Sequence, residues 1–208
     1  NKSSFNFYVT SDFATSAKQT ADDSSIAVWA LNHNGDWFWV DGICCKQTMD
    51  KTIDDLFRLC QEYRPMGVGI EVSGQQGGFV KWVEREMMNR NIWFTLASSG
   101  NGNAPGIRPA TDKLSRFNLV VPWFKMGKMY FPEEMRNSTI IGKYMTQISL
   151  ATRSGIKGKD DCLDTTSMLG YLSTWRPSES AAATPDEIEI WDNDEQAQNT
   201  TALSSYIV

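Results

Sequence analysis

The sequence contains a single histidine, His33, among its 208 residues. Zinc sites built from several imidazoles are therefore excluded, and nucleases that depend on histidine are disfavoured. The four cysteines, Cys44, Cys45, Cys60 and Cys162, include no CxxC pair. Reduced thiols in a cytoplasmic protein are thus expected in place of a disulfide framework.

Long apolar runs and nucleotide-binding loops are also absent. No apolar run approaches the ~18 residues that a membrane span requires, and residues 1–4 contain no apolar core of a signal peptide. The sequence has no GxxxxGK[ST] loop and no GxSxG turn, so phosphate-loop ATPase activity is not predicted for this chain. The chain begins at Asn1 without a methionine, which suggests a fragment of a longer protein.

The composition is that of a folded globule, with 41% hydrophobic residues and 8 Trp. The formal net charge of -5 is unevenly distributed, because residues 177–208 contain seven acidic and no basic residues. Residues 1–176 hold the other 18 acidic residues and all 20 basic ones, a net charge of +2. We therefore predict one domain over 1–176 and an acidic, flexible tail over 177–208.

Basic residues are concentrated in the second half of the predicted domain. Ten of them lie between positions 107 and 159, against three acidic residues. An excess of this size can attract a polyanion. The alternative is a solvated face of ordinary surface lysines.

Hydrophobic periodicity predicts an α/β domain. Residues 5–12 alternate with period two, and the turn at residues 33–35 joins two β-rich runs into a hairpin. The predicted strands are 5–12, 25–32, 36–44, 66–72, 92–97 and 129–131. The predicted helices are 52–63, 79–91, 111–122, 132–151 and 159–174, with a long loop over 98–109. This order indicates a mixed central sheet flanked by helices.

Carboxylates stand at the ends of these predicted elements. Asp12 closes the first strand and Glu71 closes the fourth, while Asp160, Asp161 and Asp164 open the last helix. The i, i+3 spacing of Asp161 and Asp164 places both on one side of a helix. Hard divalent cations such as Mg²⁺ and Mn²⁺ prefer oxygen ligands, and carboxylates that hold two such ions can support phosphodiester hydrolysis.

Each of these acids also has an ordinary explanation. Asp12 or Glu71 alone could be solvated at a strand end, and Asp160 could be an N-cap. The combination favours a metal site, because adjacent acids at one helix start repel one another. A bound cation would relieve that repulsion.

Several stretches together resemble the nuclease domain of the large terminase subunits of tailed bacteriophages. The similar stretches are 7–12, 22–28, 69–75, 113–122, 127–132 and 159–165. The last resembles the third acidic motif of the family, often written HDDxxDA, with Lys159 in place of the histidine and Thr165 in place of the alanine. The resemblance covers residues 5–175.

The resemblance implies a ribonuclease H-like fold and a metal-dependent endonuclease. Such an enzyme would cut concatemeric viral DNA during genome packaging, with little sequence specificity. The family's catalytic ligands of Mg²⁺ or Mn²⁺, with two ions expected, correspond to Asp12, Glu71 and Asp161. Asp164 and Asp160 correspond to additional or alternative metal ligands.

The resemblance also implies partners. Double-stranded DNA is the expected substrate, and Arg108, Lys113, Arg116 and Lys128 are predicted to line its path beside the acids. An ATPase domain of the same protein, the small terminase subunit and the portal are implied, in the host cell cytoplasm and with no membrane. Two alternatives stay open: another ribonuclease H-like nuclease of the junction resolvase or integrase type, or a non-catalytic module that docks DNA or the motor.

Overall fold

The computed structural model describes residues 2–14, 23–72, 77–152 and 155–178. The chain separates into two units, Asn1–Pro177 and Ser178–Val208, and every helix and strand below lies in the first. The predicted acidic tail lies outside the described residues except for its first two positions, so it stays a prediction. No helix of the described ranges is long and apolar enough to cross a bilayer.

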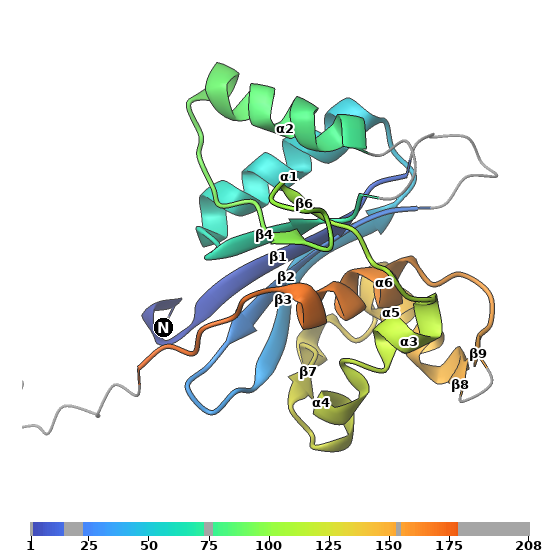
Figure 1. Ribbon diagram of the computed structural model, residues 1–208. Helices are drawn as coiled ribbons and strands as arrows, with labels where there is room; N and C mark the ends of the chain where they lie inside the picture. Colours follow the sequence, from blue (N-terminus) through green and yellow to red (C-terminus); the bar gives the residue numbers. More distant parts are fainter. Residues whose placement is uncertain (1, 15–22, 73–76, 153–154, 179–208) are drawn as a thin grey trace, which may run out of the picture. The chain divides into compact units, whose positions relative to one another are not determined.

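A five-stranded mixed sheet forms the centre of the first unit (Figure 1). Its strand order is β4-β1-β2-β3-β7. Strands β1 and β2 pair antiparallel, as do β2 and β3, while β4 joins β1 and β7 joins β3 in parallel. These strands are β1 (Asn6–Asp12), β2 (Ser24–Leu31), β3 (Trp37–Cys45), β4 (Gly67–Ile70) and β7 (Met129–Tyr130).

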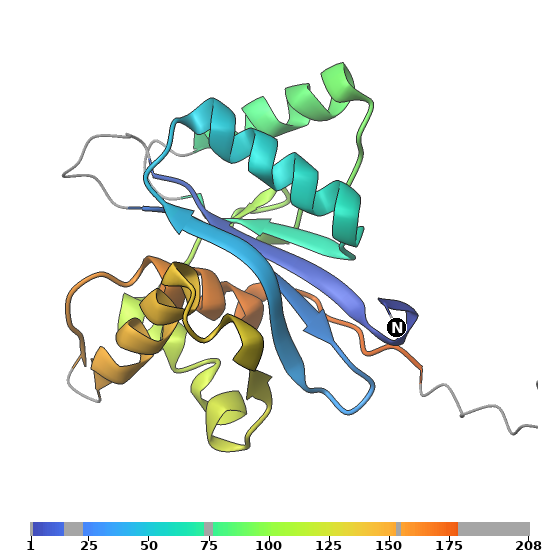
Figure 2. The same ribbon diagram turned by 180° about the vertical axis from the view of Figure 1, so that it is seen from behind.

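Helices cover both faces of this sheet, which confirms the predicted fold class (Figures 1 and 2). One face carries α1 (Met49–Tyr63) and α2 (Gly77–Arg90). The other face carries α3 (Lys113–Phe117), α4 (Val121–Lys125), α5 (Thr139–Leu150) and α6 (Asp161–Ser167).

The period-two alternation of the strands builds a separate hydrophobic core on each face. Phe7, Val9 and Val28 pack with the apolar sides of α1 and α2. Tyr8 and Trp29 point the other way and pack with α5 and α6. Because successive side chains in a strand point to opposite faces, each strand is buried on both sides.

The segment from 92 to 109 differs from its prediction. The predicted strand over 92–97 is wrong, because this segment makes only a single bridge, from Leu96 to Val68 of β4. The predicted loop over 98–109 contains a small parallel sheet of β5 (Ser98–Ser99) and β6 (Gly106–Ile107). The backbone of Ile107 also bridges to Glu71, so this loop supports the end of β4.

Three predicted helices are shorter than expected. The helix over 111–122 is divided into α3 and α4, because Pro122 suits the first turn of a new helix. The helix over 132–151 starts only at Thr139, where the Ser138 side chain accepts from the N–H of Ile141, after a 3₁₀ turn at Glu133–Met135. The helix over 159–174 consists of α6 and a 3₁₀ turn at Met168–Tyr171. The remaining small elements are the 3₁₀ turn Lys2–Ser4 and the hairpin of β8 (Ala151–Thr152) and β9 (Gly155–Ile156).

The close pairing of β2 and β3 at Gly42 leads to a stability prediction. A Cβ at Gly42 would lie 2.3 Å from the carbonyl oxygen of Ile26, so Gly42→Ala must push two central strands apart. We expect it to lower the free energy of unfolding by about 1–3 kcal/mol in urea denaturation. The control, Gly78→Ala in α2, meets nothing within 4 Å and should raise stability by about 0.5–1 kcal/mol. Equal effects of the two substitutions would contradict this explanation.

Candidate metal centre

Two parallel strands deliver carboxylates to one end of the sheet. Strand β1 ends at Asp12, and Glu71 directly follows β4. The backbone N–H of Glu71 donates to the carbonyl of Ser11 at 3.0 Å, which extends the parallel pairing by one residue. The Glu71 side chain is buried. Asp12 and Glu71 are therefore held at neighbouring carboxyl ends of the sheet.

Helix α6 brings two further acids to this end of the sheet. Asp161 and Asp164 lie in its first turn, and both side chains are buried. Helix α6 packs on β1 and β2 on the face toward which Asp12 points by strand parity. Asp160 occupies the N-cap position but makes no capping hydrogen bond; both of its oxygens accept from Lys113 Nζ at 2.8 Å.

Helix α3 supplies two cations to these carboxylates. Arg116 is only 5% exposed, and its Nη1 donates to both oxygens of Glu71 at 3.1 and 3.0 Å. Its Nη2 donates to Asp164 Oδ1 at 3.2 Å, and Lys113 Nζ lies 2.9 Å from Asp164 Oδ2. Both oxygens of Asp164 are thus engaged by cations, and one guanidinium connects the end of β4 to α6.

Burial and mutual repulsion make this group of acids hard to ionise together. Burial raises the pKa of Asp12 to about 8, and the negative charges of Glu71, Asp164 and Asp161 add to the shift. Burial also raises the pKa values of Glu71 and Asp164, although Arg116 and Lys113 oppose it. An additional cation would therefore stabilise the ionised form of the centre.

The structure brings together Asp12, Glu71, Asp161 and Asp164, with Asp160 joined to them through Lys113. The donors around Asp12 are carboxylate oxygens, the ligand type that suits Mg²⁺ and Mn²⁺. The residues therefore fit a hard divalent cation. Their individual roles as metal ligands stay predictions.

The four cations predicted to bind DNA occupy three different settings. Lys113 and Arg116 face the carboxylates, with Lys113 half exposed. Arg108 is exposed directly after β6. Lys128 pairs with Asp36 at 2.7 Å, at the β2–β3 turn. That turn is the opposite end of β2 from Asp12, so Lys128 does not lie beside the acids as expected.

The buried position of Arg116 also limits the role predicted for it. Its two ion pairs, with Glu71 and Asp164, join buried side chains. A direct contact between this guanidinium and a DNA phosphate would require those pairs to open. Lys113 and Arg108 are accessible without such a change.

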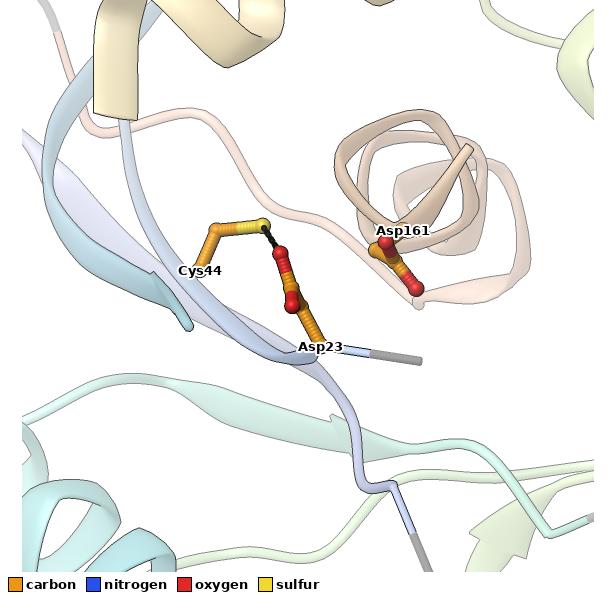
Figure 3. A group of neighbouring side chains, drawn as sticks. All are labelled: Asp23, Cys44 and Asp161. Carbon is orange, nitrogen blue, oxygen red and sulfur yellow. Dashed lines mark hydrogen bonds between the residues drawn. The ribbon is translucent and has the colours of Figure 1, made fainter. Parts of the chain in front are cut away.

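Asp23 is a buried acid near this centre that was not among the predicted site residues. It accepts from Lys143 Nζ of α5 at 2.6 Å and from Lys159 Nζ at 3.2 Å. Burial opposes its ionisation, but the two ammonium groups outweigh burial and lower the pKa of Asp23. Figure 3 shows Asp23 with Cys44 and Asp161, and ligand atoms of the three side chains lie within 4.8 Å of one another.

A sequence signal for Asp23 existed. It directly precedes β2, whose next residues pair antiparallel with the end of β1 at Asp12. It also falls within the stretch 22–28 that carries the family resemblance. Hairpin geometry alone therefore places Asp23 at the same end of the sheet as Asp12.

Sequence comparison gives no family model and no curated protein that matches this chain. Solved structures do match. The manganese-soaked, inhibitor-bound terminase nuclease domain of human cytomegalovirus is 13% identical, with a TM-score of 0.59 over 82% of this chain and 85% of that one. The magnesium-bound large terminase nuclease of thermophilic phage G20c is 14% identical, with a TM-score of 0.52 over 80% of each chain.

A third match has the same fold. The large terminase nuclease domain of Thermus phage P74-26 is 13% identical, with a TM-score of 0.51 over 86% of this chain and 84% of that one. The chain thus has the ribonuclease H-like fold of terminase nuclease domains, as the resemblance implied. At these identities the likeness concerns the fold.

The raised pKa of Asp12 predicts a specific dependence of stability on pH. Between its ordinary value of 3.8 and about 8, the folded state holds a proton on Asp12 that the unfolded state has lost. This group's contribution to stability is therefore lost as pH rises through that window. In EDTA, the difference in stability between Asp12→Asn and the wild type should shift in favour of the variant by more than about 1 kcal/mol from about pH 4 to above pH 8.

Urea unfolding at several pH values measures this difference. The control Glu134→Gln removes an exposed carboxylate and should change the free energy of unfolding by at most about 0.5 kcal/mol. An Asp12→Asn curve parallel to the wild type across the window would contradict the pKa shift.

Arg116 leads to a second stability prediction. Arg116→Gln leaves Glu71 and Asp164 buried without their shared partner, and removal of one member of a buried ion group costs about 3–5 kcal/mol. The control Arg58→Gln removes an arginine with three carboxylates at 3.6–3.8 Å, but its side chain is 50% exposed. That control should change the free energy of unfolding by at most about 1 kcal/mol. Similar losses in both variants would show that burial does not set the strength of the Arg116 pairs.

Proposed function

We propose that this protein is a metal-dependent DNA endonuclease of the terminase type. The observation that carries the proposal is the group of acids from the ends of β1 and β4 and the start of α6, in which Asp12 has a pKa raised to about 8. Such a group takes up positive charge. Nuclease domains with the same fold have been solved with magnesium or zinc bound or after a manganese soak, which supports a divalent cation; the all-carboxylate donor set favours Mg²⁺ or Mn²⁺.

Asp12, Glu71 and Asp161 are the proposed ligands of two Mg²⁺ or Mn²⁺ ions. Asp164 is less suited, because Lys113 and Arg116 already engage both of its oxygens. We assign Asp164 to the positioning of these two cations. Asp160, with both oxygens on Lys113, has the same role.

When the ions are bound, the chemistry that they supply is activation of the attacking water and stabilisation of the leaving oxygen. The residues of the chain do the rest. Arg116 holds Glu71 and α6 at a set separation. Lys113 keeps a half-exposed ammonium group next to the acids, where it can contact a phosphate of the substrate.

Double-stranded DNA is the proposed substrate, cut with little sequence specificity. Arg108 and Lys113 offer phosphate contacts, and such contacts carry no sequence information. We further propose the biological setting implied by the family: cleavage of concatemeric viral DNA in the host cell cytoplasm. The ATPase domain, the small terminase subunit and the portal are the proposed partners.

A plasmid cleavage assay tests the proposal. The wild type should nick and linearise supercoiled plasmid with Mg²⁺ or Mn²⁺, and EDTA should abolish the reaction. Asp12→Asn, Glu71→Gln and Asp161→Asn should each lower the rate by more than about 100-fold, because even residues that only support metal ligands contribute about 10–100-fold. Glu134→Gln is the control and should cut at the wild-type rate.

Other outcomes would identify the alternatives. A folded wild-type protein that binds DNA but does not cut it with Mn²⁺ would be a docking module. Strong preference for a four-way junction over linear duplex would indicate a resolvase. Full activity of Asp161→Asn with loss of activity in Asp164→Asn would exchange the roles of these two acids.

A further inference from the structure

A group of sulfur and oxygen donors lies next to the carboxylate centre and shares Asp161 with it, while its other members have no role in the proposed reaction. Ligand atoms of Asp23, Cys44 and Asp161 lie within 4.8 Å of one another, and all three side chains are buried (Figure 3). The Cys44 Sγ lies 3.9 Å from Asp23 Oδ2. We propose that this group, together with Cys162, forms a binding site for a thiophilic divalent cation such as Zn²⁺.

Cys162 supplies the second sulfur. It follows Asp161 in the first turn of α6, is fully buried and belongs to the same core cluster as Cys44. Two sulfurs and two carboxylates match the four-coordinate sites that Zn²⁺ forms with Cys and Asp. Thiolate ligands select Zn²⁺ over Mg²⁺, so this site differs in chemistry from the all-oxygen centre.

The charges of the group balance without an ion, as two carboxylates against two ammonium groups, and they balance again when a divalent cation is bound to two thiolates. Lys143 and Lys159 contact Asp23 at 2.6 and 3.2 Å and bring two positive charges to the group. With both thiols deprotonated, the two sulfurs and two carboxylates carry four negative charges. A divalent ion and the two ammonium groups carry four positive charges. Binding would release the two thiol protons to solvent. Because Lys143 and Lys159 engage both oxygens of Asp23, one of the two ammonium groups would have to give up its oxygen to the ion.

Ion binding would draw the ligands closer together. Zn–S distances of about 2.3 Å and Zn–O distances of about 2.0–2.2 Å place ligand atoms about 3.5 Å apart in a tetrahedral site. Asp161 and Cys162 share the first turn of α6, so a movement of that turn brings both toward Cys44 and Asp23. Asp161 is then withdrawn from Asp12 and Glu71. If the proposed function holds, Zn²⁺ bound at this site should inhibit the Mg²⁺-dependent cleavage of DNA, and this expectation rests on that function.

A Co²⁺ titration tests the site without any measurement of activity. Cobalt is added without Mg²⁺, which would compete for Asp161, and the thiolate-to-cobalt absorption in the near ultraviolet is recorded because only cobalt bound to sulfur gives it. The wild type should bind one Co²⁺ with this absorption, and Zn²⁺ should displace it. Cys44→Ser and Cys162→Ser should each remove about half of the absorption and weaken binding by at least about 10-fold.

Two other cysteines are matched controls. Cys45 is the neighbour of Cys44 in β3 but is exposed, and Cys60 is buried in α1 on the other face of the sheet. Cys45→Ser and Cys60→Ser should bind Co²⁺ as the wild type does. The proposal is overturned if the wild type shows no thiolate absorption. It is also overturned if Cys44→Ser and Cys162→Ser have the circular dichroism of the wild type and keep the full absorption.

Inhibition is measured in a separate plasmid cleavage assay with Mg²⁺. For each protein, the rate with added Zn²⁺ is compared with the rate of the same protein without Zn²⁺. Zn²⁺ should inhibit the wild type at least about 10-fold more strongly than Cys44→Ser, in line with the expected loss of affinity. Equal inhibition of both would overturn the link between the site and Asp161. If the protein is not a nuclease, the cobalt spectra still decide whether the site exists.

Discussion

The buried ion pairs of Arg116 with Glu71 and Asp164 are the interaction on which this end of the molecule depends. Acids from two strands and a helix meet where water is largely excluded, and their mutual repulsion opposes folding. One guanidinium offsets part of that repulsion and connects β4 to α6 through α3. Replacement of such a group by apolar residues can be neutral or stabilising, so the acids are accounted for by the proposed metal chemistry better than by a gain in stability.

The sheet decides which residues can take part in this centre. Parallel pairing of β1 and β4 places Asp12 and Glu71 at neighbouring strand ends, and the small sheet at Ile107 supports the end of β4. The antiparallel β1–β2 pair returns the chain to the same end at Asp23. Alternation along β1 and β2 leaves one face for α1 and α2 and the other for the helices that carry the remaining acids and their cations.

Hard and soft donors lie side by side in this arrangement and share Asp161. On one side are carboxylates partly neutralised by Lys113 and Arg116; on the other are the thiols and Asp23 with its two lysines. The donor atoms on each side decide which cation it favours. The oxygen-rich side suits Mg²⁺ or Mn²⁺ and the sulfur side suits Zn²⁺. A single acid in the first turn of α6 therefore couples two sites of different chemistry.

Local patterns in the sequence were sufficient to locate the five strands of the central sheet and the acids at the ends of two of them, although they also predicted a strand over 92–97 that does not form. Period-two alternation, the hairpin turn at 33–35 and the i, i+3 spacing of Asp161 and Asp164 depend on neighbouring residues only, and the mixed sheet and α6 follow from them. The break between α3 and α4 was missed because Pro122 can end one helix or begin another, and tertiary packing makes that choice. The ion pairs of Arg116 with Glu71 and Asp164, and of Lys143 with Asp23, join residues 45 to 120 positions apart. No local pattern reports such contacts, so only the tertiary structure decided which cations face the acids and which acids remain for a metal ion.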